Sequence, residues 1–362
     1  MNRRSFIAST GAAAIALKNG VAAAAPAPAP RAQMKLGDQT ERTTDTHVQF
    51  LARYGIRNIC GYPEISEGRL CANLEELKRL RELTEKYGVA VDMIPVPFLA
   101  STHIDKEPHP AIMLAESPQR DRDIEAVQNL IRDCAAAGIP AIKYNMNILG
   151  GPRSGHTPGR GDAMLSTWRA KDSHPMPALT RAGRVDADRY WERITYFLER
   201  VIPAAEEYKI RMACHPQDPG TPPGYQGVDG VLGTVEGLKK FITIKESPCH
   251  GLNFCQGSVA EMLQDPGKEI FEVIRYFGGR KKIFNVHFRN IRGHRDDFVE
   301  VYPDEGSVDM VKAMRVYKEV EYPYMLMPDH VPQAANDPHS LQSFAYCYGY
   351  IRALIQAVEE MG

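Results

Sequence analysis

The sequence predicts a single (β/α)8 TIM barrel, of the α/β class, with a long loop inserted after the fourth strand. Strand-like and helix-like segments alternate from residue 34 to residue 360, they form eight pairs, and no change of composition marks a second domain. A chain of 362 residues is long enough, since such barrels typically need about 250 residues. The alternative is an open doubly wound sheet, and the first unit lacks the Gly-x-Gly-x-x-Gly turn that would favour it.

The predicted strands are short apolar runs bounded by turn residues: 34–39, 57–62, 89–96, 140–146, 210–215, 251–256, 283–288 and 324–329. The predicted helices are the amphipathic segments 43–54, 73–87, 118–137, 187–208, 234–245, 267–278, 308–320 and 340–360. In the second helix a leucine recurs every third residue from Leu74 to Leu83, and Gly88 follows as a C-terminal stop. Each strand is thus followed by one helix, as a barrel requires.

Residues 148–184 are rich in Gly, Pro, Arg and Ser and are too long for a simple connection. They leave the fourth strand at its C-terminal end, where barrels carry their active sites. One interpretation is a lid that carries Arg153, Arg160 and Arg169 towards an anionic ligand. The other is a solvated insertion without a role.

Residues 1–30 differ in kind from the rest and are excluded from the fold. Arg3 and Arg4 precede Ser5 and Phe6, an alanine-rich apolar stretch follows, and small residues suited to signal cleavage come next. This layout resembles a twin-arginine export signal. We therefore expect an exported, periplasmic protein whose catalytic domain is residues 31–362; a disordered basic tail is the alternative.

Bulk charge and cysteine content limit the partners. Lys and Arg number 44 against 45 Asp and Glu, which gives a net charge of -1 and argues against nucleic acid or a membrane surface as a partner. A small polar ligand fits this balance. The seven cysteines are odd in number and form no regular spacing, so no disulfide scaffold is predicted.

Four consecutive predicted strands end in side chains that can bind a metal. The motifs ACHPQDP, NFCQGS, VHFRN and MPDHVP supply His215, Cys255, His287 and Asp329. These residues are 40, 32 and 42 positions apart, about one strand and helix each time. A lone His or Cys at a strand end is more often packed or hydrogen-bonded. Because neighbouring parallel strands end at the same side of a barrel, all four are instead expected to meet at one point.

Side-chain alternation supports this convergence. His215 shares a strand face with Ala213, Cys255 with Asn253, and His287 with Asn285, so each candidate ligand lies on the more polar face of its strand. Cys214 points the other way and is expected in the core. Two histidines, a thiolate and a carboxylate mix soft and hard donors, which favours a divalent transition metal over calcium. Mn²⁺ is expected first, with Zn²⁺, Co²⁺ and Fe²⁺ as alternatives.

The motifs CHPQDP, GLNFCQGS, VHFRN, GSVDM and PDH occur in the order and spacing of the mannonate dehydratase family, which the chain resembles over roughly residues 140–354. The resemblance implies a xylose-isomerase-like barrel and a metal-dependent hydro-lyase of sugar-acid breakdown. It places the metal ligands on His215, Cys255, His287 and Asp329. It further implies that His330 transfers a proton, that Arg289 contacts the substrate, and that two copies pair as a homodimer.

The sequence departs from the family at three places. Gly230 and Pro303 stand where the family has an arginine and a histidine, and a gap-free alignment puts Ala345 at the position of the catalytic tyrosine. The neighbouring Tyr346 is therefore the expected base, with Tyr348 and Tyr350 as further candidates. These departures bear on substrate identity more than on the metal site.

The expected reaction is loss of water from an aldonic acid, D-mannonate or a close relative, to give a 2-keto-3-deoxy acid. A metal held by Asp329 and its partners would stabilise the charge that develops on the carboxylate, while His330 protonates the leaving hydroxyl. Lys143 and Asn145 share one strand face and are expected to bind the substrate, as is Arg289, unless Arg289 is only a buried ion-pair partner. Asp218 is expected at the same site.

Three other functions remain open at this stage. A metal-dependent sugar isomerase or epimerase would use the same barrel, although such sites usually recruit more carboxylates. A phosphodiesterase or nuclease barrel would want several metals and a basic face. A non-catalytic periplasmic binding protein for sugar acids would have no need of a thiolate ligand.

Two further carboxylates have two possible roles. Asp218 and Glu300 either orient the metal ligands or are solvated loop carboxylates.

Overall fold

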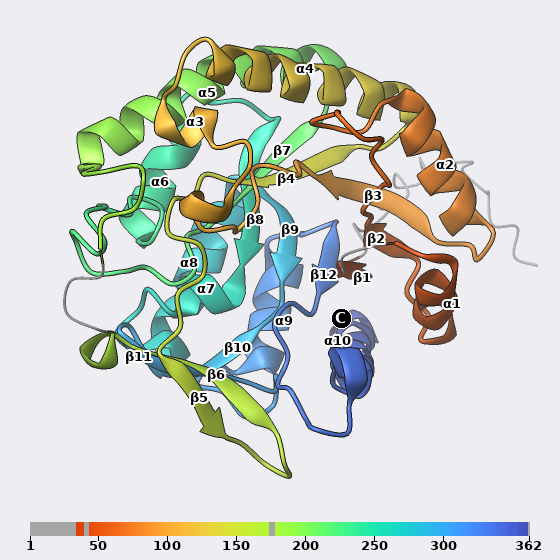
Figure 1. Ribbon diagram of the computed structural model, residues 1–362. Helices are drawn as coiled ribbons and strands as arrows, with labels where there is room; N and C mark the ends of the chain where they lie inside the picture. Colours follow the sequence, from red (N-terminus) through yellow and green to blue (C-terminus); the bar gives the residue numbers. More distant parts are fainter. Residues whose placement is uncertain (1–33, 40–42, 174–177, 361–362) are drawn as a thin grey trace, which may run out of the picture. The chain divides into compact units, whose positions relative to one another are not determined.

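The computed structural model describes residues 34–39, 43–173 and 178–360, and eight parallel strands form a closed barrel within them (Figure 1). The predicted barrel is therefore confirmed, while the predicted export signal lies outside the described residues. Around the barrel the strand order is β1-β12-β9-β8-β7-β4-β3-β2. The strands are β1 (Lys35–Gln39), β2 (Asn58–Cys60), β3 (Ala90–Pro95), β4 (Ala141–Asn145), β7 (Arg211–His215), β8 (His250–Cys255), β9 (Ile283–His287) and β12 (Met325–Met327).

Helices surround this barrel and follow the strands in turn (Figure 1). The longer ones are α1 (Asp45–Arg53), α2 (Leu74–Glu85), α4 (Gln119–Ala137), α5 (Ala187–Tyr208), α6 (Val235–Thr243), α8 (Pro266–Gly279), α9 (Met310–Glu319) and α10 (Leu341–Glu360). All eight lie within two residues of their predicted limits. Short turns of helix add α3 (Ala111–Leu114), α7 (Gln256–Ala260), η1 (Ile104–Lys106), η2 (Ala170–Asp172) and η3 (Pro338–Ser340).

Local chemistry explains why the helices begin and end where they do. Asn73 and Glu76 form a reciprocal capping box at the start of α2, which satisfies two backbone N–H groups. Gly138 ends α4 at a φ of +72°, a conformation that costs glycine little. The apolar face of α5 buries Phe197 and Val201 completely against the barrel. Burying one such side chain contributes about 1.5–3 kcal/mol, so packing rather than helix propensity holds this layer in place.

The inner strand faces change from apolar to polar towards their C-terminal ends. Apolar residues form a separate buried cluster that includes Ala141, Ala213 and Met327. Two positions further along the same faces come Lys143, His215 and Asp329. Register brings the strand ends level: Asn145 pairs with His215, and His287 pairs with both Cys255 and Met327. Apolar side chains thus fill the barrel interior, and the polar side chains lie at the C-terminal ends of its strands.

The inserted loop contains strands that the sequence did not predict. An antiparallel sheet in the order β10-β11-β6-β5 combines β5 (Gly155–Pro158) and β6 (Met164–Arg169) of the insertion with β10 (Asn290–His294) and β11 (Asp297–Val301). It lies at the bottom of Figure 1. Leu165, Val299 and Val301 form its small apolar core. The insertion is therefore anchored to the segment that follows β9 and is more than a solvated loop.

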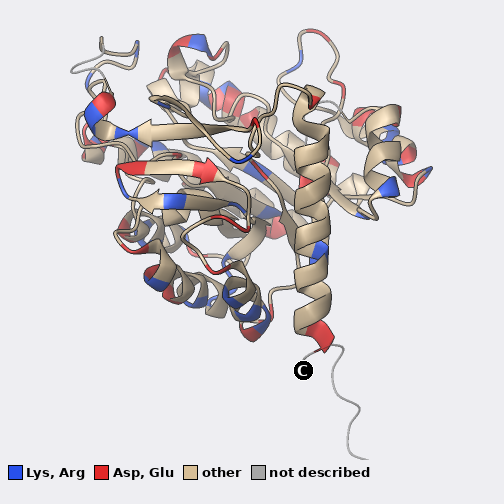
Figure 2. Cartoon of the chain, turned by 90° about the horizontal axis from the view of Figure 1, so that it is seen from below, with Lys and Arg blue, Asp and Glu red and all other residues tan. Residues whose placement is uncertain are grey.

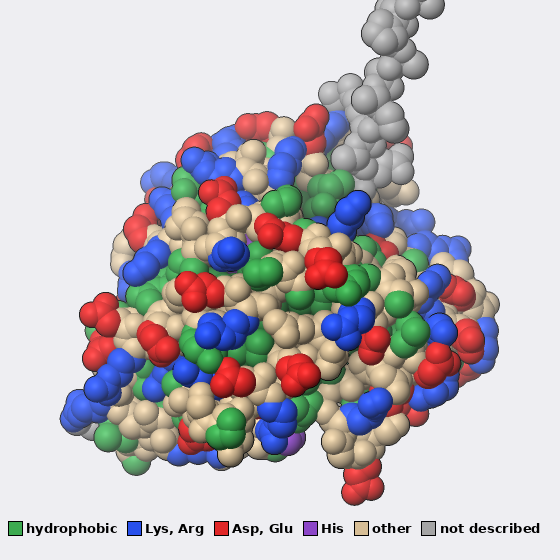
Figure 3. Space-filling model, turned by 90° about the horizontal axis from the view of Figure 1, so that it is seen from above, with side chains coloured by type: hydrophobic (Ala, Val, Ile, Leu, Met, Phe, Trp, Pro, Cys, Tyr) green, Lys and Arg blue, Asp and Glu red, His purple; other side chains and the backbone are tan. Residues whose placement is uncertain are grey.

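Charges of both signs are interspersed over the surface. Figures 2 and 3 show Lys and Arg next to Asp and Glu on both faces drawn, without a broad area of one sign. This matches the net charge of -1. Within the described ranges, no helix combines the length and the apolar character needed to cross a membrane.

Candidate metal centre and active site

The four predicted metal ligands converge at the C-terminal end of the barrel. One donor atom from each of His215, Cys255, His287 and Asp329 lies within 4.8 Å of the other three. Their strands β7, β8, β9 and β12 are neighbours in the barrel, which is why residues so far apart in sequence meet. Two nitrogens, a sulfur and an oxygen make a donor set suited to a divalent transition metal.

The ring of His215 is oriented by the backbone. Its Nδ1 lies 2.6 Å from the carbonyl oxygen of Pro216, a contact in which Nδ1–H donates and Nε2 keeps its lone pair. Burial lowers the pKa of His215 to about 3, and the neighbouring His287 adds to this effect. His215 is therefore neutral at physiological pH, the form in which imidazole binds a metal.

His287 presents a buried nitrogen to a carboxylate. Its Nε2 lies 3.1 Å from Oε1 of Gln39, which leaves Nδ1 on the side of Asp329. In the described part of the chain Nδ1 has no hydrogen-bond partner, although Oδ2 of Asp329 is 3.4 Å away. Burial lowers the pKa of His287, so its ring is neutral and one ring nitrogen keeps a lone pair. The Nδ2 of Asn253 also lies 3.1 Å from Nε2, so the neighbouring amides determine which nitrogen carries the proton.

Cys255 and Asp329 complete the set. The Sγ atom of Cys255 is 3.6 Å from Oδ2 of Asp329 and accepts a hydrogen bond from the backbone N–H of Ser258 at 3.4 Å. Burial raises the pKa of the Cys255 thiol, so a bound cation is what would favour its thiolate. Burial opposes the charge of Asp329, yet His287 and His330 hold its pKa well below the ordinary value. The four residues therefore fit a metal ion.

Arg289 is the centre of a buried ion-pair network behind the metal ligands. Its Nη2 lies 2.7 Å from Asp218 and 2.8 Å from Glu261, and its Nη1 lies 2.7 Å from Glu300. Only 1% of its side chain is exposed. The structure thus places Arg289 as an ion-pair partner of these three carboxylates and, at 3.8 Å, of Asp329, and the two cavities described below do not include it in their lining.

His330 is held in its charged form by the same network. Its Nδ1 lies 3.0 Å from both carboxylate oxygens of Glu300, and 49% of its side chain is exposed. Partial burial opposes the charge, but Asp329 and Glu300 raise the pKa of His330 to about 9. Burial likewise opposes ionisation of Glu300, whose pKa is lowered to about 2 by Arg289 and His330. A protonated histidine at a cavity can act as an acid.

The three arginines of the insertion that were expected in a lid, Arg153, Arg160 and Arg169, all pair with carboxylates of the protein. Arg153 contacts both Asp218 and Glu300 in the buried network. Near the surface, Arg160 lies 2.6 Å from Asp304, and Arg169 lies 3.3 Å from Asp297. These three arginines therefore contact carboxylates of the protein and line neither cavity described below, and a role towards an anionic ligand stays a prediction.

A cavity of about 350 Å³ opens beside the metal ligands. Lys143, Asn145 and Asp218, all predicted at the substrate site, line it together with His215, His287, Asp329 and His330. The Nζ of Lys143 donates to Oε1 of Gln39 and lies 3.1 Å from the hydroxyl of Tyr62. Burial works against its charge, but Tyr62 and Cys60 raise the pKa of Lys143. The cavity therefore combines a cation, an acid and the metal ligands.

Tyr346 lies in a different cluster. Its ring packs edge-on against Tyr302 at a centroid distance of 5.5 Å and lies under the guanidinium of Arg160. Neither cavity is lined by Tyr346, and 40% of the residue is exposed. Tyr348 donates its hydroxyl to Asp38, and Tyr350 is half-buried. The role predicted for Tyr346 thus has no supporting contact in the structure and stays a prediction.

Three residues at the site were missed by sequence reasoning. Gln39 contacts Asp329, His287 and Lys143, and Tyr62 lies against Lys143. Glu261 pairs with Arg289 from the turn after α7. The available signal was position: Gln39 ends the first strand, as His215 ends the strand of its own unit. An amide at such a place is too common to single out without the fold.

A family model described as D-mannonate dehydratase (UxuA) matches residues 173–362. A mannonate dehydratase from Streptococcus agalactiae is 30% identical over 284 residues, covering 71% of this chain and 77% of that protein. The chain belongs to the mannonate dehydratase family. Its enzymes are hydro-lyases, so the chain is a lyase that removes water from a sugar acid.

Other mannonate dehydratases are similar over most of their length. The one from Thermotoga petrophila is 28% identical over 327 residues, which cover 80% of this chain and 87% of that protein. The crystal structure of mannonate dehydratase from Streptococcus suis superposes with a TM-score of 0.77 at 23% identity, covering 91% and 96% of the two chains. A xylose isomerase domain protein from Planctomyces limnophilus gives 0.58 at 13% identity, covering 91% of this chain and 99% of that one. These structures share the barrel fold.

Proposed function

We propose that the chain is a divalent-metal-dependent dehydratase that converts D-mannonate to 2-keto-3-deoxygluconate. The observation that carries the proposal is the set of four donor atoms within 4.8 Å of one another, next to a cavity lined by Lys143 and His330. Family membership supports dehydration of a sugar acid. The metal, the substrate and the product are the proposed parts.

His215, Cys255, His287 and Asp329 would hold the metal, for which Mn²⁺ is the first candidate. When bound, it supplies Lewis-acid stabilisation of negative charge on the substrate carboxylate, typically worth several kcal/mol. His330 gives its proton to the departing C3 hydroxyl. Glu300 keeps His330 protonated and oriented through contacts of 3.0 Å.

For the proton on C2, the geometry favours Tyr62 over Tyr346 as the base. The hydroxyl of Tyr62 lies 3.1 Å from Nζ of Lys143, which lines the cavity, and a nearby ammonium stabilises a phenolate. Lys143 and the protonated His330 are cations in the cavity lining, whereas the neighbouring Arg153 and Arg289 are paired with carboxylates and do not line it. Asn145 lies beside it and can bind a substrate hydroxyl.

The test is to load residues 31–362 with Mn²⁺ under reducing conditions, supply D-mannonate and measure 2-keto-3-deoxygluconate together with bound metal. Cys255→Ala should lose metal and product, whereas Cys214→Ala is the matched control, because Cys214 is buried on the opposite strand face. Bound metal without product from D-mannonate would overturn the substrate assignment, and assays on aldoses and ketoses would then test an isomerase. Full metal content in Cys255→Ala would overturn the ligand set.

Two further proposals concern the whole molecule. We propose that the chain is exported through its N-terminal Arg3-Arg4 signal, and that Arg3→Lys with Arg4→Lys abolishes export in a cell-fractionation assay. A doubly substituted chain that still leaves the cytoplasm would contradict this.

We also propose that two copies of the chain pair into a homodimer. Sedimentation velocity at micromolar concentration tests this, and a monomer would contradict it.

A further inference from the structure

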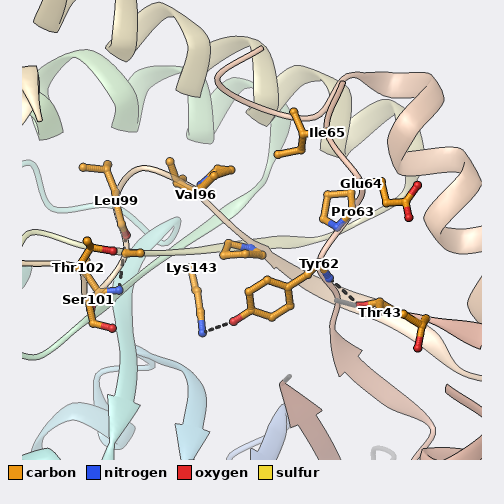
Figure 4. Close-up of a pocket in the computed structure, with 15 residues that line it drawn as sticks. Thr43, Tyr62, Pro63, Glu64, Ile65, Val96, Leu99, Ser101, Thr102 and Lys143 are labelled. Carbon is orange, nitrogen blue, oxygen red and sulfur yellow. Dashed lines mark hydrogen bonds between the residues drawn. The ribbon is translucent and has the colours of Figure 1, made fainter. Parts of the chain in front are cut away.

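A second, larger cavity adjoins the one at the metal ligands. It measures about 800 Å³, against about 350 Å³ for the inner cavity. The two share Ser101, Lys143 and Asn145 in their lining, so they adjoin at these side chains. Figure 4 shows Lys143 and Tyr62 in contact on one side of the larger cavity, with Ile65 and Val96 on the opposite side. We refer to the larger space as the outer cavity.

The combined space is larger than a free six-carbon acid requires. Small-ligand sites span about 300–1,000 Å³ and enclose most of the ligand surface. The inner cavity alone, at about 350 Å³, already reaches this range. A hexonate held there would leave the outer cavity to water. A ligand that fills both spaces must have a second part of substantial size.

The lining of the outer cavity indicates what this second part is. Its apolar wall contains the ring of Tyr62, Ile65, Val96 and Leu99 together with three prolines, and its polar wall carries the hydroxyls of Thr43, Thr44, Ser101 and Thr102. Such a mixture suits a pyranose ring, which has apolar C–H faces and hydroxyl edges. The charged groups are Glu64 and the shared Lys143. The outer cavity thus has one carboxylate and shares its cation with the inner cavity, which disfavours a ligand with a second acidic group.

The position of the reacting atoms sets the direction of the ligand. Dehydration takes place at C2 and C3, next to the carboxylate, and His330 and the metal ligands lie in the inner cavity. The carboxylate end must therefore occupy the inner cavity. With C2 facing Tyr62 at the junction, the remote end, from C4 to C6, extends past Lys143 and can carry a substituent into the outer cavity.

We propose that the outer cavity binds an uncharged sugar unit joined to the remote end of the aldonic acid, so that the preferred substrates are glycosylated aldonic acids. This inference rests on the proposed dehydratase function and names its substrate class. The bond to the second sugar is not broken. Water leaves from C2 and C3 of the acid unit, and the product is the glycosylated 2-keto-3-deoxy acid.

The experiment compares D-mannonate with 4-O-glucosyl-D-mannonate on the Mn²⁺-loaded chain, by calorimetric Kd and by kcat/KM. The glucosylated acid should bind at least tenfold more tightly. Ile65→Trp and Ala100→Trp each fill part of the outer cavity and should bring the ratio of the two Kd values close to one. Val311→Trp adds the same side chain to a solvent-exposed position on α9 and should leave the ratio unchanged. Circular dichroism checks the fold of each variant.

Equal or weaker binding of the glucosylated acid would overturn the inference, as would a tenfold preference that both tryptophan variants of the outer cavity retain. If D-mannonate is dehydrated and the glucosylated acid is not preferred, the inference fails and the proposed function stands. If the glucosylated acid binds more tightly but neither acid is dehydrated, the outer cavity is supported and the proposed reaction fails. Because Ile65 and Ala100 lie on different segments, the second variant still tests the inference if the first one misfolds.

Discussion

The Nδ1 atom of His330 lies 3.0 Å from both carboxylate oxygens of Glu300, and Glu300 in turn contacts Arg289 at 2.7 Å. The acid of the proposed reaction is thereby linked to a buried network that also supports the metal ligands. Asp329 lies 3.8 Å from the Nε of Arg289 at the other end of this chain of contacts. The candidate metal ligand Asp329 and the proposed acid His330 are thus positioned by one set of charges.

Replacing Glu300 should lower the rate of the chemical step without weakening substrate binding. Glu300→Gln keeps the shape but removes the charge that holds the proton on His330, so we expect kcat to fall about 10²-fold with little change in KM. Steady-state kinetics on D-mannonate measure this. Glu305→Gln is the control, since Glu305 lies in the same segment and contacts the surface residue Arg160 at 3.7 Å. A kcat within threefold of wild type would show that Glu300 is dispensable.

Arg153 should contribute strongly to stability although it comes from an insertion. Arg153→Ala leaves Asp218 and Glu300 buried with one partner fewer, and breaking such a pair typically costs about 3–5 kcal/mol. Arg169→Ala removes a partly exposed pair on the same insertion and should cost less than about 1 kcal/mol. Urea unfolding compares the two. Similar losses for both variants would contradict the distinction.

Two phenylalanine variants decide between the candidate bases. Tyr62→Phe removes the hydroxyl next to Lys143 and should lower kcat about 10²-fold or more, with unchanged metal content. Tyr346→Phe alters a residue packed against Tyr302 and Arg160 and should change kcat less than threefold. Single-turnover rates on D-mannonate give the comparison. The reverse order of effects would restore Tyr346 as the base and remove Tyr62.

The pH dependence of stability should depend on His250, a buried histidine at the start of β8. Burial lowers its pKa to about 4, although a contact of 2.9 Å with the carbonyl of Phe241 favours its charged form. The unfolded chain therefore binds a proton near pH 6.5 that the folded chain does not bind. Stability is lost as the pH falls from 7 to 5, by about 2 kcal/mol from this group.

His250→Gln should remove that part of the loss, measured as the difference between urea unfolding free energies at pH 7 and pH 5. His294→Gln provides the control, because His294 is exposed on β10. Parallel pH profiles for wild type and His250→Gln would show that His250 does not cause the loss.

The barrel and the convergence of the four candidate metal ligands could be predicted because their signals are local. Each strand and helix is encoded by the period of its own apolar residues, and His215, Cys255 and His287 each end such a run. Alternation then fixes the face of each side chain, and the closed sheet brings the ends together.

The second sheet and the charge network could not be predicted, because they depend on contacts between distant segments. β5 is the polar stretch Gly155–Pro158, whose strand character comes from pairing with β6. Arg153 meets Glu300 across 147 residues, and nothing near either residue indicates the other. The position of Tyr346 depended in the same way on the packing of α10 against Tyr302.

The candidate metal ligands and the outer cavity lie over different strands of the barrel. The metal ligands end β7, β8, β9 and β12, whereas the outer cavity lies over the ends of β2, β3 and β4. Because these groups of strands are consecutive around the barrel, selection can reshape one while the other is held constant. Exchanging the loop after β3 for that of a relative, with Tyr62 after β2 retained, would then transfer ligand preference and leave the reaction intact. Such a protein is a modular starting point for engineering dehydratases of new acids.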